Sequence, residues 1–321
     1  MTHKARIFKS SKRQFDCQIL QTKEIVHATA MATLLKEDHL VVGDWVELEA
    51  PPKPGDSWAI MSVEKRVNAI YRNLPREQKK KVIASNVDMI LIVASCSKPT
   101  YKRGLVDRYL ARASFWDIPA FVVFNKMDQY DPEEFNLVDE ADRLQWVNAE
   151  CFEISAEKPD YKPRYLSQGF SELSSKLKGK TAILLGHSGV GKSRLITSLS
   201  NGKAQLLSAE LGKVGKGAHT TTWAELIDAE LFHLIDSPGV RSMSINDLTR
   251  DELLYSFPDI NEFATKCRFS SSCTHDENAK GCFFQGLDKT KREDQLILSR
   301  LESFKRMLEE VSDIPDWLKK S

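Results

Sequence analysis

Short apolar stretches separated by polar or Pro/Gly-rich breaks run through the first 68 residues. They predict strands at residues 16–21, 24–30, 40–50 and 57–67. Several short strands at this spacing are typical of a small closed barrel. One interpretation is a small β domain without a specific role. The other is an OB-type barrel, a common scaffold for binding oligonucleotides.

Residues 69–85, "AIYRNLPREQKKKVIAS", are rich in positive charge and predict a connector between two regions. Their basic residues are Arg72, Arg76, Lys79, Lys80 and Lys81. Because a run of charge is usually a solvated face, we assign this segment no further role.

From Val87 onward, apolar stretches alternate with segments of helical periodicity. Strands are predicted within 87–95, 119–124, 151–154, 181–185 and 231–236, and helices within 103–116, 133–148 and 194–201. This alternation predicts a doubly wound α/β fold with a mostly parallel sheet. Ligands of such sheets bind at the carboxyl ends of the strands.

Beyond about Ser244 we expect a short helical segment, a cluster of cysteine and histidine, and a last helix. Apolar residues in the last helix recur at spacings of three and four, which is typical of a packing face. They are Ile297, Leu301, Phe304, Leu308 and Val311. The sequence therefore predicts three domains: a barrel at 1–68, an α/β domain at 69–244 and a helical metal-binding domain at 245–321.

The composition, with 41% hydrophobic and 28% charged residues, is that of an ordinary globular protein. A formal net charge of +1 gives no global reason to expect nucleic acid or an anionic membrane, so RNA contacts would need local basic patches. The longest apolar runs, "MILIVA" and "FVVF", are too short to span a bilayer, and the N-terminus lacks the apolar core of a secretory signal. We expect a cytoplasmic monomer with reduced thiols and no membrane contact.

Residues 186–193, "GHSGVGKS", match G-x-x-x-x-G-K-[ST] between an apolar strand and a helical segment. A phosphate-binding loop requires that context, because backbone N–H groups of the loop and of the helix N-terminus bind phosphate oxygens. Lys192 is expected to reach the β- and γ-phosphates and Ser193 to ligate Mg²⁺. A Gly-rich turn can also be purely structural, and the motif does not distinguish ATP from GTP.

Downstream, "DSPG" follows another apolar strand. Asp236 is the expected acid near Mg²⁺, and the N–H of Gly239 is expected to meet the γ-phosphate. The preceding "GKVGKGAHTTTWAEL" suits a loop that Mg²⁺ and the γ-phosphate order, with Thr221, between Thr220 and Thr222, as the expected third Mg²⁺ ligand. The alternative is a flexible loop leading into the strand "WAELID".

Residues 125–128, "NKMD", stand at the end of a predicted strand and indicate a guanine reader. The Asp128 carboxylate can accept from both N1–H and the exocyclic amine of guanine, which adenine does not offer. Asn125 can meet the other edge of the base or brace the loops, and the stem of Lys126 can lie over the ring. Ser155 and Ala156, in "ISA" after the next strand, are expected to back the guanine.

The guanine reader precedes the phosphate loop, whereas most proteins with both motifs have the opposite order. The order indicates a circularly permuted GTPase, because a sheet depends on spatial proximity and domain termini often lie close together. After "DSPGV" the chain runs directly into the Cys/His region. We hypothesise that movement at Gly239 is thereby linked to the C-terminal domain.

At this point the chain resembles the RsgA (YjeQ) family of circularly permuted GTPases, which act in maturation of the small ribosomal subunit. The motifs that carry the resemblance run nearly end to end: "VVGDWVEL", "ASNVDMILIVAS", "VDRYL", "FNKMD", "ISA", "GHSGVGKS", "GKGAHTTT", "DSPGV" and the Cys/His cluster. The resemblance implies an OB barrel, a permuted GTPase domain, a zinc domain, and GTP hydrolysis stimulated by the small subunit and its rRNA. The motifs assign GTP contacts to Asn125, Lys126, Asp128, Ser155, Ala156, Gly186, His187, Ser188, Gly189, Val190, Gly191, Lys192, Ser193, Arg194, Asp236 and Gly239.

The hydrolytic residues are less defined, because Val240 stands where Ras-like enzymes have the Gln that orients water. We therefore expect slow intrinsic turnover. His219 matches the family pattern G-x-x-H-T-T-T, and it joins Lys192 and Thr221 as the candidate catalytic residues. The alternatives are a simple surface histidine, or a partner that orders the loops or supplies the missing group.

The cluster "CRFSSSCTHDENAKGC" has the form C-x5-C-x-H-x6-C. Three thiolates and one imidazole, from Cys267, Cys273, His275 and Cys282, meet the tetrahedral requirement of a closed structural zinc site. The spacing is one residue longer on each side of C-x-H than the family pattern. The alternative is free cysteines packed in a small domain.

The leading functional hypothesis is a GTPase checkpoint in small-subunit assembly, with GTP, Mg²⁺ and one structural zinc. A second is an RNA-binding module in which GTP is a conformational ligand, and a third is a permuted GTPase that serves the large subunit. The Asp128 carboxylate argues against an ATP-dependent enzyme.

Overall fold

The computed structural model describes residues 2–11, 13–31, 34, 39–53, 55–74, 79–203, 224–236 and 243–312. The chain forms two compact units. Unit 1 comprises residues 1–91, 172–185 and 191–241, and unit 2 comprises residues 92–171, 186–190 and 242–321. One boundary follows Val190, so the "GHSGVGKS" motif contributes residues to both units.

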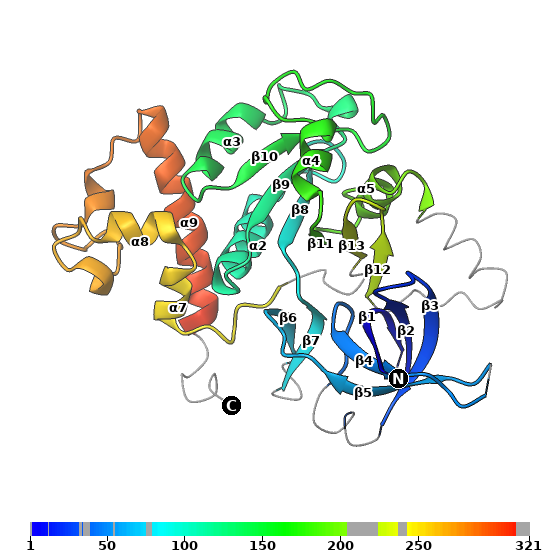
Figure 1. Ribbon diagram of the computed structural model, residues 1–321. Coiled ribbons are helices and arrows are strands. Elements are labelled where there is room, and N and C mark those ends of the chain that lie inside the picture. Colours follow the sequence, from blue (N-terminus) through cyan, green and yellow to red (C-terminus); the bar gives the residue numbers. More distant parts are fainter. Residues whose placement is uncertain are drawn as a thin grey trace. The chain divides into compact units, whose positions relative to one another are not determined.

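The N-terminal strands of unit 1 form a five-stranded barrel (Figure 1). They are β1 (Thr2–Ser11), β2 (Gln14–Ile19), β3 (Ile25–Ala30), β4 (Trp45–Glu49) and β5 (Trp58–Val63). Strand β1 pairs with both β2 and β4, and β3 pairs in parallel with β5, so the sheet closes on itself. Its interior holds Ala5, Ile7, Phe15, Cys17, Val46, Leu48 and Ile60. The predicted N-terminal barrel is confirmed.

Strand β1 was missed in the sequence because basic residues interrupt its apolar alternation. Ala5 and Ile7 fill the barrel core, while Arg6 between them is buried on the other face. The Arg6 guanidinium donates to Thr181 Oγ1 at 2.7 Å and to the carbonyl of Asn86 at 2.9 Å. Burial lowers the pKa of Arg6 to about 10, against the opposing effect of nearby carboxylates. Arg6 therefore remains charged and ties the barrel to the rest of unit 1.

The predicted connector at 69–85 is in fact an antiparallel hairpin of β6 (Ala69–Leu74) and β7 (Lys79–Ser85). Its inner residues, Ile70 and Ala84, are buried, which the charge run concealed. The hairpin approaches the barrel closely at Gly43. This residue has φ 94°, and a Cβ there would lie 2.1 Å from the carbonyl oxygen of Ser85.

The remaining elements of unit 1 build the α/β part of the unit. They are β11 (Thr181–Leu185), β12 (Glu225–Asp228), β13 (His233–Asp236), α5 (Lys192–Leu199) and most of α4 (Phe170–Leu177), a helix that was not predicted. Strands β11 and β13 are parallel with Leu184 opposite Asp236. Strand β12 pairs antiparallel with β13 and with β1, so the barrel and this sheet share a ladder.

Unit 2 contains the strands β9 (Ala120–Asn125) and β10 (Glu150–Glu153), which are parallel, and most of β8 (Met89–Ser95) beside β9. Two helices and a short 3-10 turn join them: α2 (Arg103–Phe115), η1 (Met127–Gln129) and α3 (Leu137–Gln145). Strand β8 is buried along its whole length, as a continuous apolar run predicts. The predicted α/β region with largely parallel strands is confirmed.

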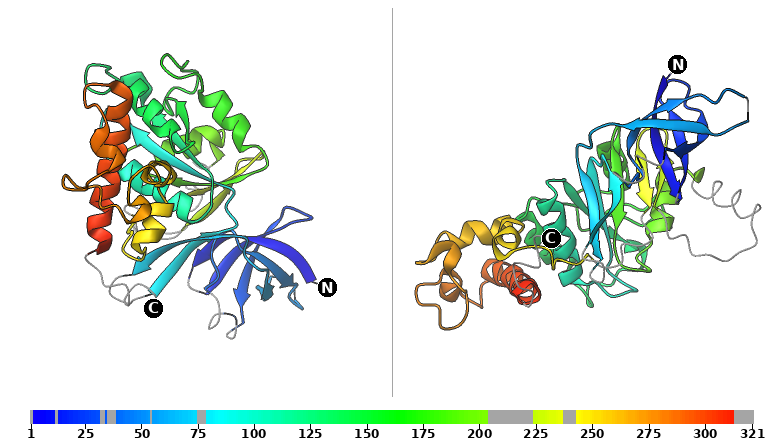
Figure 2. Two further views of the ribbon diagram at one scale, coloured as in Figure 1. Left: turned by 90° about the vertical axis from the view of Figure 1, so that its left-hand side faces the viewer. Right: turned by 90° about the horizontal axis from the view of Figure 1, so that it is seen from below.

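The C-terminal part of unit 2 is helical (Figure 2). It contains α7 (Arg250–Tyr255), α8 (Pro258–Ala264), η2 (Ser270–Ser272), η3 (Phe283–Gly286) and the long α9 (Arg292–Ser312). The predicted stripe of α9 faces a core that also includes Ala111 of α2. Helix α9 therefore packs on the α/β part of the same unit. No described helix is long and apolar enough to cross a bilayer.

Candidate functional site

Asn125, the last residue of β9, joins three predicted motifs in unit 2. Its side chain is buried, donates through Nδ2 to the carbonyl of Val190 at 2.9 Å, and accepts from the N–H of Ala156 at 2.8 Å. Of the two roles considered for this amide, the structure shows the bracing of loops. It connects the guanine reader, the loop after β10 and the phosphate loop.

The rest of the guanine reader lies beside the loop after β10. Lys126 adopts a left-handed backbone with φ 66°, and its Nζ donates to the carbonyl of Lys98 at 2.5 Å. One Asp128 carboxylate oxygen accepts from Ser155 Oγ at 2.8 Å, and the other lies 3.4 Å from Lys158 Nζ. The acid is thus oriented by a hydroxyl and compensated by a cation.

Glu153, at the end of β10, organises the loop that follows Ser155. Its buried carboxylate accepts the backbone N–H groups of Arg164, Tyr165 and Leu166 at 2.8–2.9 Å and the hydroxyl of Tyr161 at 2.6 Å. Four donors to one anion fix a loop that has no regular secondary structure of its own. Burial and this carboxylate together raise the pKa of the Tyr161 hydroxyl.

The first half of the phosphate loop also lies in unit 2. Gly186 has φ 152°, and a Cβ at this residue would lie 2.3 Å from the carbonyl oxygen of Val93, so only glycine fits. The hydroxyl of Tyr109 contacts the Gly186 backbone, and burial is the main cause that raises its pKa to about 12. Lys102 Nζ donates to His187 Nε2 at 3.1 Å.

The second half of the motif begins helix α5 in unit 1. Gly191 caps the helix with φ 96°, followed by Lys192, Ser193 and Arg194 in its first turn. Asp236 ends β13, opposite Leu184 of the parallel strand β11 that leads into the phosphate loop. The acid therefore stands at the carboxyl end of its strand, as the sequence predicts.

Some predicted site residues lie outside the described residues. They are His219, Thr220, Thr221, Thr222, Gly239 and Val240. Their assignments to Mg²⁺, the γ-phosphate and the attacking water stay predictions.

The four predicted zinc ligands come together in unit 2. All are buried, and their ligand atoms lie within 4.8 Å of one another. His275 Nδ1 is 3.7 Å from Cys267 Sγ and 3.6 Å from Cys282 Sγ, and the two sulfurs are 4.0 Å apart. Metal–ligand bonds of about 2.0–2.3 Å in a tetrahedron require edges of about 3.5–3.8 Å. The donor set thus fits one tetrahedral zinc ion.

Burial of this cluster acts in opposite directions on His275 and Cys267 as metal ligands. Burial lowers the pKa of His275, which keeps the imidazole neutral, as a metal ligand must be. Burial raises the pKa of the Cys267 thiol to about 11, opposed by the N–H of Phe283, which donates to its sulfur at 3.3 Å. A divalent cation would reverse the effect of burial, because it stabilises the thiolate directly.

Lys158, Glu153 and the contacts of the segment before α2 were not predicted from the sequence. The sequence around Glu153 gives little indication of its role. The donors to its carboxylate are mostly backbone N–H groups, which any loop sequence provides. Lys158 stands three residues after Ser155, and only the fold brings it to Asp128.

Comparisons with known proteins agree with this arrangement. Residues 63–246 match the family model described as RsgA GTPase. A small ribosomal subunit biogenesis GTPase RsgA of Bacteroides fragilis is 31% identical over 258 residues, covering 79% of this chain and 79% of the relative. A protein of the same description from Chlorobaculum parvum is 32% identical over 285 residues, covering 85% and 86%.

Two solved structures share the fold. YjeQ from Thermotoga maritima superimposes with a TM-score of 0.72 at 24% identity, covering 98% of this chain and 100% of that one. YloQ, described as a circularly permuted GTPase, has a TM-score of 0.70 at 21% identity, covering 98% and 97%. With the barrel, the α/β region and the Cys/His cluster in place, the chain belongs to the RsgA GTPase family.

Proposed function

We propose that this protein binds GTP, hydrolyses it, and uses the reaction at a late step or checkpoint in the maturation of the small ribosomal subunit. The family supports GTP hydrolysis, and the description of the relatives as small ribosomal subunit biogenesis GTPases supports the biological role. The subunit and its rRNA are the proposed partners, and they stimulate turnover. The proposed setting is the cytoplasm, with the protein a monomer.

The bracing of Asn125 is the observation that carries this proposal. One amide contacts the carbonyl of Val190 in the phosphate loop and the N–H of Ala156 in the base loop. Base reading and phosphate binding are thus parts of one hydrogen-bonded arrangement despite their reversed order in the chain. An arrangement of this kind serves a guanine nucleotide with both a base and phosphates.

In the proposed complex, Asp128 reads the guanine while Ser155 and Ala156 back it. The loop at 186–193 binds the phosphates through its N–H groups, and Lys192 contacts the β- and γ-phosphates. His187, Ser188, Gly189, Val190, Gly191, Arg194 and Gly239 complete the proposed GTP contacts.

Magnesium and the attacking water complete the proposed mechanism. Ser193, Thr221 and Asp236 are the proposed Mg²⁺ ligands, and a bound Mg²⁺ would neutralise charge that develops on the phosphates. Lys192 and Thr221 stabilise charge on the transferred phosphoryl group, and His219 orients the water. Turnover without the subunit is slow, because Val240 stands in place of the Gln that orients the attacking water in Ras-like enzymes.

The three predicted domains have separate roles in the proposal. The barrel at 1–68 contacts rRNA, the region at 69–244 binds and hydrolyses GTP, and the region at 245–321 holds a structural zinc ion through its Cys/His cluster. A bound zinc ion would cross-link the segments that carry its four ligands and so stabilise this part of the chain.

The test is GTP hydrolysis by the purified protein, alone and with isolated small ribosomal subunits. Large subunits and ATP serve as controls. Stimulation at least tenfold by small subunits alone is expected. Tight GTP binding without stimulation by either subunit would instead favour an RNA-binding switch in which GTP is a conformational ligand.

The base assignment has its own matched test. Asp128→Asn removes the acceptor pair for guanine and should reduce the preference for GTP over ATP by at least 100-fold. Asp131→Asn, an exposed acid in the same loop, is the control. Unchanged selectivity in Asp128→Asn contradicts the proposed base site.

A further inference from the structure

The segment Ser97–Lys102, here called the 97–102 loop, contacts two parts of the proposed nucleotide site within unit 2. One is the "NKMD" segment and the other is the phosphate loop. Its Lys98 carbonyl accepts from Lys126 Nζ at 2.5 Å on the guanine side. On the phosphate side, Pro99 lies 3.5 Å from where a Cβ of Gly189 would stand, and Lys102 Nζ is 3.1 Å from His187 Nε2. Between the 97–102 loop and the phosphate loop lies a cavity of only about 20 Å³.

Tyr101 anchors this loop. Its ring packs against Phe135 and Phe124, with ring centroids 4.6 and 5.9 Å away. Its hydroxyl donates to Glu140 Oε1 on α3 at 2.8 Å. Burial, reinforced by Glu140, raises the pKa of Tyr101 well above its usual value, so the donor proton stays in place at neutral pH.

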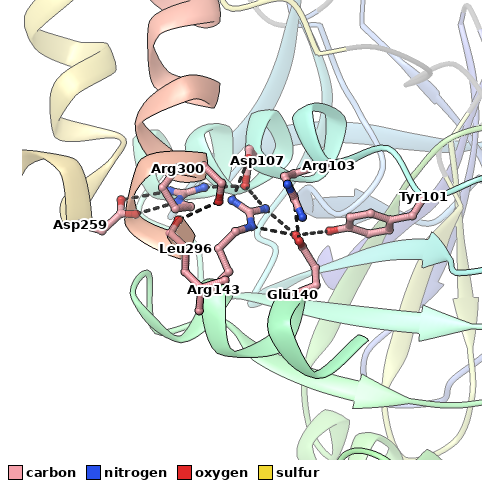
Figure 3. A network of polar contacts seen from close by, with 9 residues as sticks. Tyr101, Arg103, Asp107, Glu140, Arg143, Asp259, Leu296 and Arg300 are labelled. Carbon is pink, nitrogen blue, oxygen red and sulfur yellow. Dashed lines mark hydrogen bonds and ion pairs between the residues drawn. The ribbon is translucent and has the colours of Figure 1, made fainter. Parts of the chain in front are cut away.

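Glu140 is the first member of a buried ion network that continues away from the loop (Figure 3). Its carboxylate is fully buried and accepts from Arg143 at 2.5 and 3.0 Å and from Arg103 at 2.9 Å. Arg143 also donates two bonds to Asp107 of α2, at 3.0 and 3.1 Å. The orientation of Glu140 therefore depends on Asp107 through a shared guanidinium.

The network ends on the C-terminal helix. Arg300 of α9 donates to Asp107 at 2.6 Å and forms two bonds with Asp259 of α8, at 2.6 and 3.1 Å. These side chains are 0–3% exposed. Buried carboxylates and guanidiniums keep their charges only when each is paired, so loss or movement of one member forces its neighbours to rearrange.

We propose that Tyr101 is a positioning residue for the guanine nucleotide, and that Arg300 of the C-terminal helix sets nucleotide affinity through the buried network that holds Tyr101. The inference rests on the proposed GTP site and adds a route by which helix α9 acts on it. A partner that shifts α9 would then change how tightly the nucleotide is held. This route stays within unit 2 and does not involve the "DSPG" segment.

The experiment measures the binding and release of a fluorescent GDP analogue by the full-length protein. Tyr101→Phe keeps the packed ring and removes one hydrogen bond to a buried carboxylate. It should raise Kd and the release rate about three- to tenfold. In steady-state hydrolysis KM should rise while kcat stays within twofold, because the loop affects binding rather than the chemical step. The Tm should fall by no more than about 2 °C, which separates positioning from general damage.

Arg300→Lys tests the distal end, since lysine keeps the charge but cannot pair with Asp107 and both Asp259 oxygens. It should also raise Kd, and its combination with Tyr101→Phe should raise Kd less than the product of the single effects. The control is Glu310→Gln, which removes the Arg108–Glu310 ion pair between the same helices α2 and α9 without touching the network. Should Arg300→Lys not fold, Asp259→Asn replaces it.

The outcomes are distinct. Failure of the wild-type protein to bind the GDP analogue overturns the proposed function before any variant is made. Binding by the wild type together with Kd, release and KM of Tyr101→Phe within twofold of wild type overturns the role of Tyr101. Multiplicative effects in the double variant, or an equal effect of Glu310→Gln, overturn the role of Arg300.

Discussion

Arg300 and Asp107 are 193 residues apart in the chain, yet their side chains form a buried ion pair at 2.6 Å. Asp107 also receives two bonds from Arg143, so this carboxylate neutralises parts of two guanidiniums. The pair joins the GTPase part of unit 2 to its C-terminal helix.

Asp107→Asn should lower the free energy of unfolding by about 3–5 kcal/mol at pH 7.5, because it leaves buried positive charge without its partner. Burial alone would raise the pKa of Asp107, but Arg300 and Arg143 outweigh burial and hold it below its usual value. Because the pKa of Asp107 is lower in the folded protein than in the unfolded chain, where it is about 3.9, the ionised carboxylate stabilises the fold above that pH. This stabilisation is lost as the pH falls through the pKa of the folded state.

The difference in the free energy of unfolding between the wild type and Asp107→Asn should therefore become smaller in acid. Urea unfolding at pH 7.5, 5 and 3.5 measures it. Asp117→Asn, an exposed position with φ 54° that asparagine tolerates, is the control and should change stability by less than about 0.5 kcal/mol. A difference that widens below pH 4 contradicts the assignment.

Gly186→Ala should abolish nucleotide binding and cost more than about 2 kcal/mol of stability. The new Cβ would lie 2.3 Å from the carbonyl of Val93, at a φ that alanine avoids. Gly104→Ala, in helix α2 with no atom near the new Cβ, should instead stabilise by up to about 1 kcal/mol. Equal nucleotide affinity in both variants would contradict the proposed role of Gly186 in the phosphate loop.

The Cys/His cluster should hold about one zinc per chain, because it offers four ligands in a closed set. His275→Ala and Cys282→Ser should lose the metal and lower the Tm by at least 5 °C, and a strong chelator should do the same to the wild type. Metal analysis and thermal unfolding provide the measurements. Cys151→Ser, a thiol outside the cluster, should retain full zinc content, and zinc retention by His275→Ala would contradict the ligand set.

Glu153→Gln should loosen the loop at 156–169, because an amide N–H₂ would face backbone N–H groups that now donate to a carboxylate. Trypsin should cut after Arg164, which precedes Tyr165, at least fivefold faster than in the wild type, and a guanine nucleotide should slow the cleavage. Glu134→Gln, an exposed acid, is the control. Unchanged cleavage in Glu153→Gln would show that the loop holds its conformation without this carboxylate.

Many candidate site residues could be named from the sequence because the chemistry proposed for them requires particular residue types in unbroken order. Glycines at 186 and 191 meet backbone demands that few other residues satisfy, and the lysine and serine that follow provide the side chains expected for phosphate and Mg²⁺. The Cys/His cluster is similar, since zinc accepts few donor types and all four stand within one short segment. Local motifs of this kind need no knowledge of the fold.

Other features were hidden because they depend on distant residues. Nothing near Asp107 in the sequence indicates that it pairs with Arg300. An arginine in the middle of an amphipathic helix is normally predicted to lie on the surface. Strand β1 was concealed because Arg6 is buried with polar partners, which breaks the expected alternation. The hairpin at 69–85 was concealed because its charge outweighed two buried apolar residues, Ile70 and Ala84.

The members of the ion network are also synthesised at different times during translation. Arg143 follows Asp107 closely and is available to it early in translation, whereas Arg300 emerges 193 residues later. At about 5–20 residues per second this interval lasts about 10–40 s. The last nucleotide motif, "DSPG" at 236–239, precedes Arg300 by 61 residues, so for about 3–12 s of this interval the nascent chain has its nucleotide motifs but lacks the helix that completes their support. A chain still being synthesised should therefore hold GTP more weakly than the finished one.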